Sequence, residues 1–571
     1  MKSFAHILLV SCTALLLFSS CSNKAPKEAR YIPKDASLVL SIDPGQLKEK
    51  LQNGGITIDT LISYVFSKDS TDQKDKAKLK DLRENAGINW ESQVFFFFNQ
   101  KAYPDESHST TFSIIAGLKD AGKFETFLKK QHSFQDKNVV KQKDYSYAAN
   151  DDHTMASWND QQLIITFYNH PAKLIPDTSS MQQGQPQSYP EQEEMKQEVN
   201  RYYTQKTSES MADQSVFTGM FKDRADGYMY TNSSASLASL SMLPLQLPKL
   251  DELIKDNYST ATLNFENGRI LAKSASFTNP MLTSILKQYS GPTVSLPLIE
   301  HYPSAHVNSV MMASFNPEMI GGIMKQLEVE GLANNFLEKA GLSSQDIYHS
   351  LKGDMAIVVS DIGMHPTASE NTQGKGLLSK FGKVLITAPV GDTASFRKIM
   401  DKAVDQGLIV KDNDHYRASG FVSAVGIFVR ADTHNLVIAS DSSLYEQYQA
   451  KKETIGLSKE VLDMFQGKTS VFYFDIAGTL RNFASDSTSG YHHSLNTAVG
   501  TFKDVIASTD SFDGKSVQAK LEVRMQNQQQ NSLVTLTSLL TDIAVDMRQQ
   551  AKKRGESSFL PGGVPAIIRT N

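Results

Sequence analysis

Cysteine, tryptophan and net positive charge are all scarce in this 571-residue chain. Two cysteines exclude a disulfide scaffold and any cysteine-rich zinc or iron–sulfur site. The 58 Lys and Arg residues are outnumbered by 62 Asp and Glu residues, giving a formal net charge of −4. Nucleic-acid binding needs a basic surface that displaces counterions, so no nucleic-acid partner is expected.

Long hydrophobic runs are also missing, apart from residues 7–18 near the start. That run is shorter than the roughly 20 apolar residues of a membrane-spanning helix, and Lys2 precedes it, as in a secretory leader. Residues 17–21 read Leu-Phe-Ser-Ser-Cys, which resembles a bacterial lipobox. We therefore expect residues 1–20 to be a lipoprotein signal peptide and Cys21 to carry the lipid. The alternative is an ordinary secretory leader with an incidental cysteine.

A lipid on Cys21 predicts a protein that is anchored to a membrane without crossing it. Residues 21–30 read as a polar tether with three cations and one acid. Surface-exported lipoproteins of Bacteroidetes-type bacteria share an acidic patch just after the lipidated cysteine, and this tether lacks one. This favours the cell envelope, at the outer membrane and facing the periplasm, although the cell surface stays open.

The chain repeats several features in the same order. Residues 31–44 and 302–317 both contain a proline, a β-rich run and then Asp-Pro or Asn-Pro, which predicts a helix capped by Asp43 or Asn316. Asp120 and Asp392 are expected to cap two further equivalent helices. The dipeptides at 267–268 (Asn-Gly) and 513–514 (Asp-Gly) are signals for two-residue hairpins.

This order indicates a tandem duplication with an α+β fold: two homologous domains, each a mostly antiparallel sheet with helices packed on one face. The expected bounds are 31–290 for the first domain, 291–302 for a linker and 303–550 for the second domain. A polar insertion is expected at about 178–210, a long loop at 362–382 and a flexible tail at 551–571. A closing helix is expected at 532–548, with one apolar stripe: Leu533, Leu536, Leu540, Ile543 and Met547.

A search for chemical motifs finds none, so no cofactor, metal or nucleotide is expected. Gly467, Lys468 and Thr469 lack the upstream glycine of a phosphate loop and precede a strand. Residues 420–426 have the wrong spacing for a nucleophile elbow and fall in an expected strand. Residues 94–98 (Val-Phe-Phe-Phe-Phe) predict a central strand covered on both faces, in preference to an apolar ligand pocket. Trp90 and Trp158 are expected to pack at sheet edges.

The lipobox ending at Cys21 and the opening at residues 32–43 (Ile-Pro-Lys-Asp-Ala-Ser-Leu-Val-Leu-Ser-Ile-Asp) resemble the Bacteroidetes lipoproteins known only as domain of unknown function 4836. The likeness covers most of the mature chain. The resemblance implies an envelope lipoprotein and brings no catalytic residues with it.

Two functions remain open. The first is a non-enzymatic binding or scaffold protein that takes a protein, peptide or glycan in a cleft between the domains or on the long loops. The alternative is an envelope hydrolase of polysaccharide or peptide, whose carboxylates are dispersed in sequence. Two carboxyl groups roughly 5–10 Å apart in a cleft would favour the hydrolase, and an apolar cleft would favour binding.

Overall fold

The computed structural model describes residues 26–57, 59–60, 70–103, 108–130, 139–150, 153–169, 191–236, 247–363, 382–424, 426–484 and 492–554. The expected signal peptide, Cys21, most of the 362–382 loop and the final residues of the expected tail lie outside these ranges. So does the first part of the 178–210 insertion, whose remainder forms α6 (Glu191–Thr204) and η3 (Thr207–Glu209).

The first half of the fold contains ten strands: β1 (Leu38–Ile42), β2 (Val94–Ala102), β3 (His108–Gly117), β4 (Val139–Lys141), β5 (Ser146–Ala149), β6 (Thr154–Trp158), β7 (Gln162–Asn169), β8 (Gly227–Asn232), β9 (Tyr258–Glu266) and β10 (Arg269–Phe277). Its helices are η1 (Lys27–Tyr31), α2 (Pro44–Asn53), α4 (Ser70–Asn85), α5 (Ala121–Lys130), α6 (Glu191–Thr204), η3 (Thr207–Glu209), η4 (Met211–Asp213), α7 (Ser215–Gly219), η5 (Met220–Lys222), η6 (Ser233–Ser236), α9 (Leu250–Ile254) and α10 (Pro280–Gln288).

The second half also contains ten: β11 (Val307–Ser314), β12 (Asp354–Ser360), β13 (Lys383–Pro389), β14 (Ile409–Asp412), β15 (His415–Ala418), β16 (Phe428–Ala431), β17 (Asn435–Ala439), β18 (Ser470–Phe474), β19 (Phe502–Thr509) and β20 (Ser516–Met525). Its helices are α11 (Pro297–Glu300), α12 (Glu318–Gln326), α13 (Glu330–Lys339), α14 (Ser344–Ser350), α15 (Thr393–Asp405), α16 (Gly420–Ala424), α17 (Ser442–Ala450), α18 (Lys459–Phe465), α19 (Ile476–Ala484), α20 (His492–Thr501) and α21 (Ser532–Arg554).

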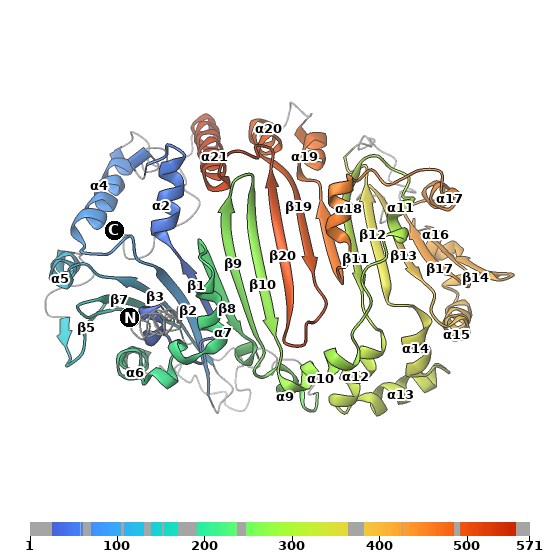
Figure 1. Ribbon diagram of the computed structural model, residues 1–571, viewed down its shortest axis with the longest axis horizontal. Helices are drawn as coiled ribbons and strands as arrows, with labels where there is room; N and C mark the ends of the chain where they lie inside the picture. Colours follow the sequence, from blue (N-terminus) through green and yellow to red (C-terminus); the bar gives the residue numbers. More distant parts are fainter. Residues whose placement is uncertain are drawn as a thin grey trace, which may run out of the picture.

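These twenty strands form one sheet in which every pairing is antiparallel (Figure 1). Across the sheet the first half runs β4-β5-β6-β7-β3-β2-β1-β8-β9-β10, and the second half continues β20-β19-β18-β11-β12-β13-β17-β16-β15-β14. The expected α+β class is confirmed. Each half has the same strand order, counted from its own first strand, while the common ancestry of the halves stays a prediction.

The expectation of two separate sheets is wrong, because the halves join edge to edge. Strand β10 pairs with β20 over its whole length, from Arg269 opposite Arg524 to Phe277 opposite Ser516. The chain after β20 then returns to the first half, where α21 packs against α2 and Val534 lies against Gly54. No interdomain cleft therefore opens between the two sets of described strands.

Local capping signals are mostly confirmed. The Asp43 side chain accepts a hydrogen bond of 3.0 Å from the Gln46 backbone N–H, and Pro44 is the first residue of α2. Asp120 and Asp392 cap α5 and α15 in the same way. Asn316 accepts from the Glu318 N–H, so α12 begins one residue later than expected.

The hairpin signals differ in outcome. Asn267 and Gly268 form the expected two-residue turn between β9 and β10, with a φ of 71° at the glycine. Asp513 and Gly514 instead lie within the longer connection 510–515, where the Asp513 carboxylate accepts from the backbone N–H of Ser516. Residues 420–424 form α16, so the strand expected there is wrong.

Two predicted connectors belong to the hydrophobic cores. In the expected linker, Ile299 and Tyr302 are completely buried in the second core. In the expected tether, Glu28 and Ala29 belong to η1 and are buried, so the tether expectation does not hold for these residues. The stripe expected on the last helix is also wrong over its described side chains, where the buried apolar residues are Val534 and Leu539, whereas Leu540 is exposed. Met547 lies outside the described side chains.

Candidate functional site

The two faces of the sheet have different cover. Side chains alternate between the faces along each strand, so the registers assign every paired residue to one face. The covered face packs against η1, α6 and α7 in the first half and against α11, α17 and α18 in the second half. Figure 1 looks onto this face. The opposite face, here called the open face, is covered by α5 and α15 at its two outer ends.

Between those ends, the open face exposes large apolar side chains. Five of the most exposed large apolar residues in the described strands occupy this face: Ile42 (39% exposed), Met229 (37%), Met311 (46%), Phe472 (39%) and Leu521 (39%). Phe96 and Phe98 of β2 also lie on it and are half-buried, whereas Phe95 and Phe97 are completely buried on the covered face. The expectation that residues 94–98 are covered on both faces is therefore wrong.

The open face is also uncharged. Fourteen consecutive strands, from β7 to β17 across the sheet, contribute paired residues to it, and among these described positions none is Asp, Glu, Lys or Arg. A sheet face that meets only water normally carries alternating polar residues. This face therefore has the composition of a surface that contacts apolar matter.

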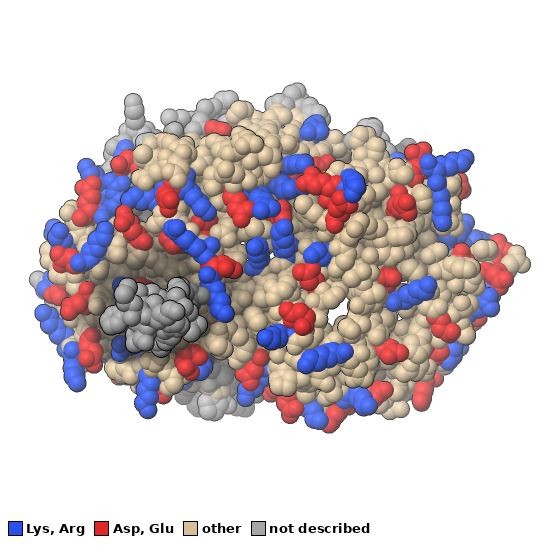
Figure 2. Space-filling model, viewed as in Figure 1, with Lys and Arg blue, Asp and Glu red and all other residues tan. Residues whose placement is uncertain are grey.

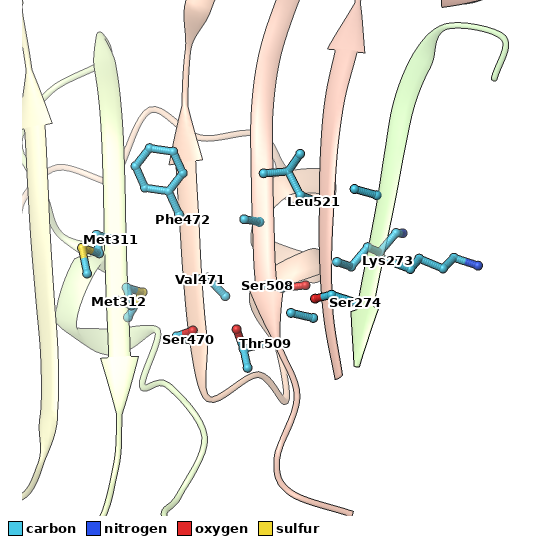
Figure 3. Close-up of a pocket in the computed structure, with 14 residues that line it drawn as sticks. Lys273, Ser274, Met311, Met312, Ser470, Val471, Phe472, Ser508, Thr509 and Leu521 are labelled. Atoms are coloured by element: carbon cyan, nitrogen blue, oxygen red, sulfur yellow. The ribbon is translucent and has the colours of Figure 1, made fainter. Parts of the chain in front are cut away.

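A hollow of about 480 Å³ lies at the centre of the open face, where the two halves join (Figure 3). Strands β10, β20, β19, β18 and β11 form it, and no helix residue lines it. The open-face side chains in it are Ala272, Ser274, Met311, Ser470, Phe472, Ala507, Thr509, Ala519 and Leu521. Ala507 lies opposite Phe472 on one side and Leu521 on the other, so a small side chain between two large ones contributes to this volume.

A second hollow of about 580 Å³ lies on the open face in the first half. Its floor includes Leu38 and Phe98, and amide and hydroxyl groups surround them: Gln100, Thr110, Thr231, Asn232, Asn257 and Ser259. No charged residue lines this second hollow, whereas Lys273 and Lys520 of the covered face are among the residues that line the central one. The second hollow is nevertheless the richer in amide and hydroxyl groups.

Charged residues of the same central strands lie on the covered face. There Arg524 donates hydrogen bonds of 2.6 and 2.7 Å to Asp504, and both side chains are buried. The bonds to Asp504 raise the pKa of Arg524. Burial opposes the ionisation of Glu522, but its bonds to Lys520 and Arg269 outweigh that effect and lower its pKa. Figure 2 shows charged side chains of both signs across this face.

Two carboxyl groups have a raised pKa, as a general acid would need. Burial raises the pKa of Glu198, which accepts a hydrogen bond of 3.0 Å from Asn99 on the covered face. Burial also raises the pKa of Asp475, which accepts from the Gly478 N–H at the start of α19. Neither residue lines either hollow.

Of the residues considered in the search for chemical motifs, Phe98 lines the second hollow, and the other described ones line neither hollow. Lys468 pairs with Asp510 at 2.5 Å, and Thr469 donates to the Thr509 carbonyl, so both stabilise the β18–β19 hairpin. Trp158 is buried beside Phe124, as expected, but Trp90 is exposed. Cys21 lies outside the described residues. Among the residues that are described, no group of three metal-ligating side chains occurs, and no helix is long and apolar enough to span a membrane.

Comparison with known proteins gives a family and no activity. No curated protein matches the chain. Two crystal forms of the protein TP0453 are similar over part of it: form IV has 12% identity, covers 46% of this chain and 84% of that chain, and has a TM-score of 0.22. Form I has 10% identity, covers 48% and 88%, and has a TM-score of 0.21. Likenesses this low support no argument about fold or function. Residues 29–533 match one family model, and the chain therefore belongs to the family described as Domain of unknown function (DUF4836).

Proposed function

We propose that this protein is a non-enzymatic binding protein of the cell envelope that holds the apolar part of a ligand on its open face. The single observation that supports the proposal is the apolar surface between α5 and α15, which no described helix covers and which carries no Asp, Glu, Lys or Arg among the described paired residues. Soluble proteins rarely expose contiguous apolar patches of more than a few hundred Å², and larger patches are typical of binding surfaces.

The same observation favours binding over hydrolysis. A glycoside hydrolase needs two carboxyl groups about 5–10 Å apart around its substrate. The residues that line the two hollows include no carboxylate, and the two acids with a raised pKa lie outside them. The arrangement of the described residues therefore supports a ligand held by apolar contact and hydroxyl groups.

A fluorescent apolar probe tests the proposal. We expect the mature chain, made from residue 21 onward with Cys21→Ser, to bind the uncharged probe N-phenyl-1-naphthylamine saturably. Phe472→Asp places a charge in the hollow and should weaken binding at least about tenfold, which is about 1.4 kcal/mol. Phe336→Asp on α13 is the matched control, because Phe336 is 75% exposed and lies outside the open face. Equal affinity in both variants, or no saturable binding, would contradict the proposal.

We also propose that Cys21 is lipidated and that the anchor holds the protein at the outer membrane, facing the periplasm. The lipobox-like residues 17–21 and the non-acidic segment that follows support this assignment. In the native cell, Cys21→Ala should move the full-length protein from the membrane fraction to the soluble periplasmic fraction. Retention of the variant in the membrane fraction would count against the anchor.

A further inference from the structure

We infer that the ligand of the central hollow is a membrane phospholipid with two acyl chains and a zwitterionic head group. This inference rests on the proposed function and names the ligand class. Its first support is a change of polarity along the strands of the hollow, which Figure 3 shows around Phe472 and Ser470.

Three transverse rows of open-face residues define this change of polarity. The row nearest α19 is apolar on four strands, with Ile270, Val523, Val505 and Phe474, and has Ser309 on β11. The middle row is also apolar: Ala272, Leu521, Ala507, Phe472 and Met311. The third row is the richest in hydroxyl groups, with three among its five residues: Ser274, Ala519, Thr509, Ser470 and Ala313. An amphiphile would therefore lie along the strands, with its tail toward α19 and its head at the third row.

The dimensions of the hollow match acyl chains of membrane lipids. Phe474 and Ser470 are four residues apart on β18, which is roughly 14 Å of strand. One leaflet of a bilayer has a hydrocarbon thickness of about 15 Å. Across the sheet, the five strands from β10 to β11 span about 19 Å. Since carbon atoms contact one another at about 4 Å, this width exceeds that of a single chain and accommodates two.

Charge complementarity indicates the head group. Lys468 lies two residues before Ser470, the first residue of β18, and Asp510 directly follows Thr509, the last residue of β19, so both lie at the end of the strands that carries the third row. Their side chains pair at 2.5 Å and are partly exposed, at 30% and 47%. A phosphoethanolamine head carries one anionic and one cationic group, so it complements this Lys–Asp pair. An anionic head without an amine complements only the lysine.

The proposed anchor makes a membrane lipid the nearest apolar ligand. Six residue steps separate Cys21 from Lys27, where η1 begins, so this segment reaches at most about 20 Å when fully extended. Lys27 would therefore remain within that distance of the bilayer surface. Membrane phospholipid is present there at far higher local concentration than any free apolar solute.

The experiment compares three lipids on the same mature Cys21→Ser chain. The protein is equilibrated with vesicles that contain phosphatidylethanolamine, phosphatidylglycerol and lysophosphatidylethanolamine in equal amounts. After the vesicles are removed by centrifugation, the lipid retained by the protein is quantified by mass spectrometry. We expect phosphatidylethanolamine to exceed the one-chain lysolipid by about tenfold and the anionic phosphatidylglycerol by several-fold. Phe472→Asp should abolish retention and Phe336→Asp should leave it unchanged. Asp510→Asn should remove the preference for phosphatidylethanolamine over phosphatidylglycerol, because Asp510 is the member of the pair that complements the amine.

The outcomes separate this inference from the proposed function. The inference would be overturned by any of three results: equal retention of the lysolipid, no head-group preference, or no retained lipid. If Phe472→Asp still weakens the binding of N-phenyl-1-naphthylamine in that case, the proposed function would stand. Loss of both lipid and probe binding in a folded protein would overturn both. Lipid retention that Phe336→Asp and Phe472→Asp reduce equally would show general adsorption to membranes and would also overturn the inference.

Discussion

The buried Arg524–Asp504 pair gives the sharpest test of how the centre of the sheet is stabilised. The two side chains are 6% and 3% exposed, and two hydrogen bonds join them behind the hollow. Arg524→Met keeps a side chain of similar length but leaves Asp504 buried without its cation. Removing one partner of a buried ion pair costs about 3–5 kcal/mol, because the remaining charge loses its compensation. We expect a loss of that size in the free energy of unfolding, measured by urea denaturation followed by circular dichroism.

Two further variants separate the ion pair from simple truncation of the arginine. Arg397→Met removes a guanidinium paired with the exposed Asp414 and should cost less than about 1 kcal/mol. The double variant Arg524→Met with Asp504→Leu removes both buried charges and should regain most of the lost stability, since Glu460 is 57% exposed and returns to water. If Arg524→Met costs no more than Arg397→Met, the reasoning about the buried charge is refuted.

Three other predictions follow from packing, backbone and burial. Phe97→Ala should cost about 3–5 kcal/mol of unfolding free energy and Phe96→Ala less than half as much, because Phe97 is fully buried and Phe96 lies on the open face; equal losses in urea denaturation would mean that both faces are covered. Gly353→Ala should lower the free energy of unfolding by about 1–3 kcal/mol, because φ is 92° and the new Cβ would lie 2.0 Å from the Phe315 carbonyl oxygen. In the control Gly219→Ala the new Cβ meets no atom within 4 Å, so the melting temperature should fall little or not at all. Burial raises the pKa of Tyr202, Tyr203 and Tyr302, so these phenols stay protonated in the folded state above the unfolded value of about 10. Stability should therefore fall as pH rises above about 10, with phenolate absorbance appearing together with unfolding, and phenolate formation in the native state at that pH would contradict it.

Local features were predictable because their causes are local. Asp43 and Asp392 cap helices through backbone N–H groups three residues away, and Asn267–Gly268 closes a turn between adjacent strands. The β10–β20 pairing joins residues about 250 positions apart, so no short pattern encodes it. The α21 stripe failed for the same reason, since the helix packs against α2 of the opposite half.

The candidate site was missed because hydrophobicity does not reveal what covers a residue. Residues 94–98 are apolar at every position, which is the pattern of a strand buried on both faces, yet Phe96 and Phe98 lie on the open face. In β20 the charges of Lys520, Glu522 and Arg524 alternate with apolar residues, and such alternation normally places the apolar side in the core. Here the charged side meets the covered face instead. The available signal was that the uncharged alternate positions of the central strands all belong to the same face of the sheet.

The seam between the halves has the geometry of a symmetric dimer contact. The final strand of one half meets the final strand of the other in antiparallel pairing, as two identical subunits meet across a two-fold axis. A fragment that stopped after α10 would leave β10 as a bare edge with unpaired N–H and C=O groups. Two such fragments would satisfy these groups by pairing with each other. In the intact chain β20 occupies this edge instead, so each molecule contains one copy of each half.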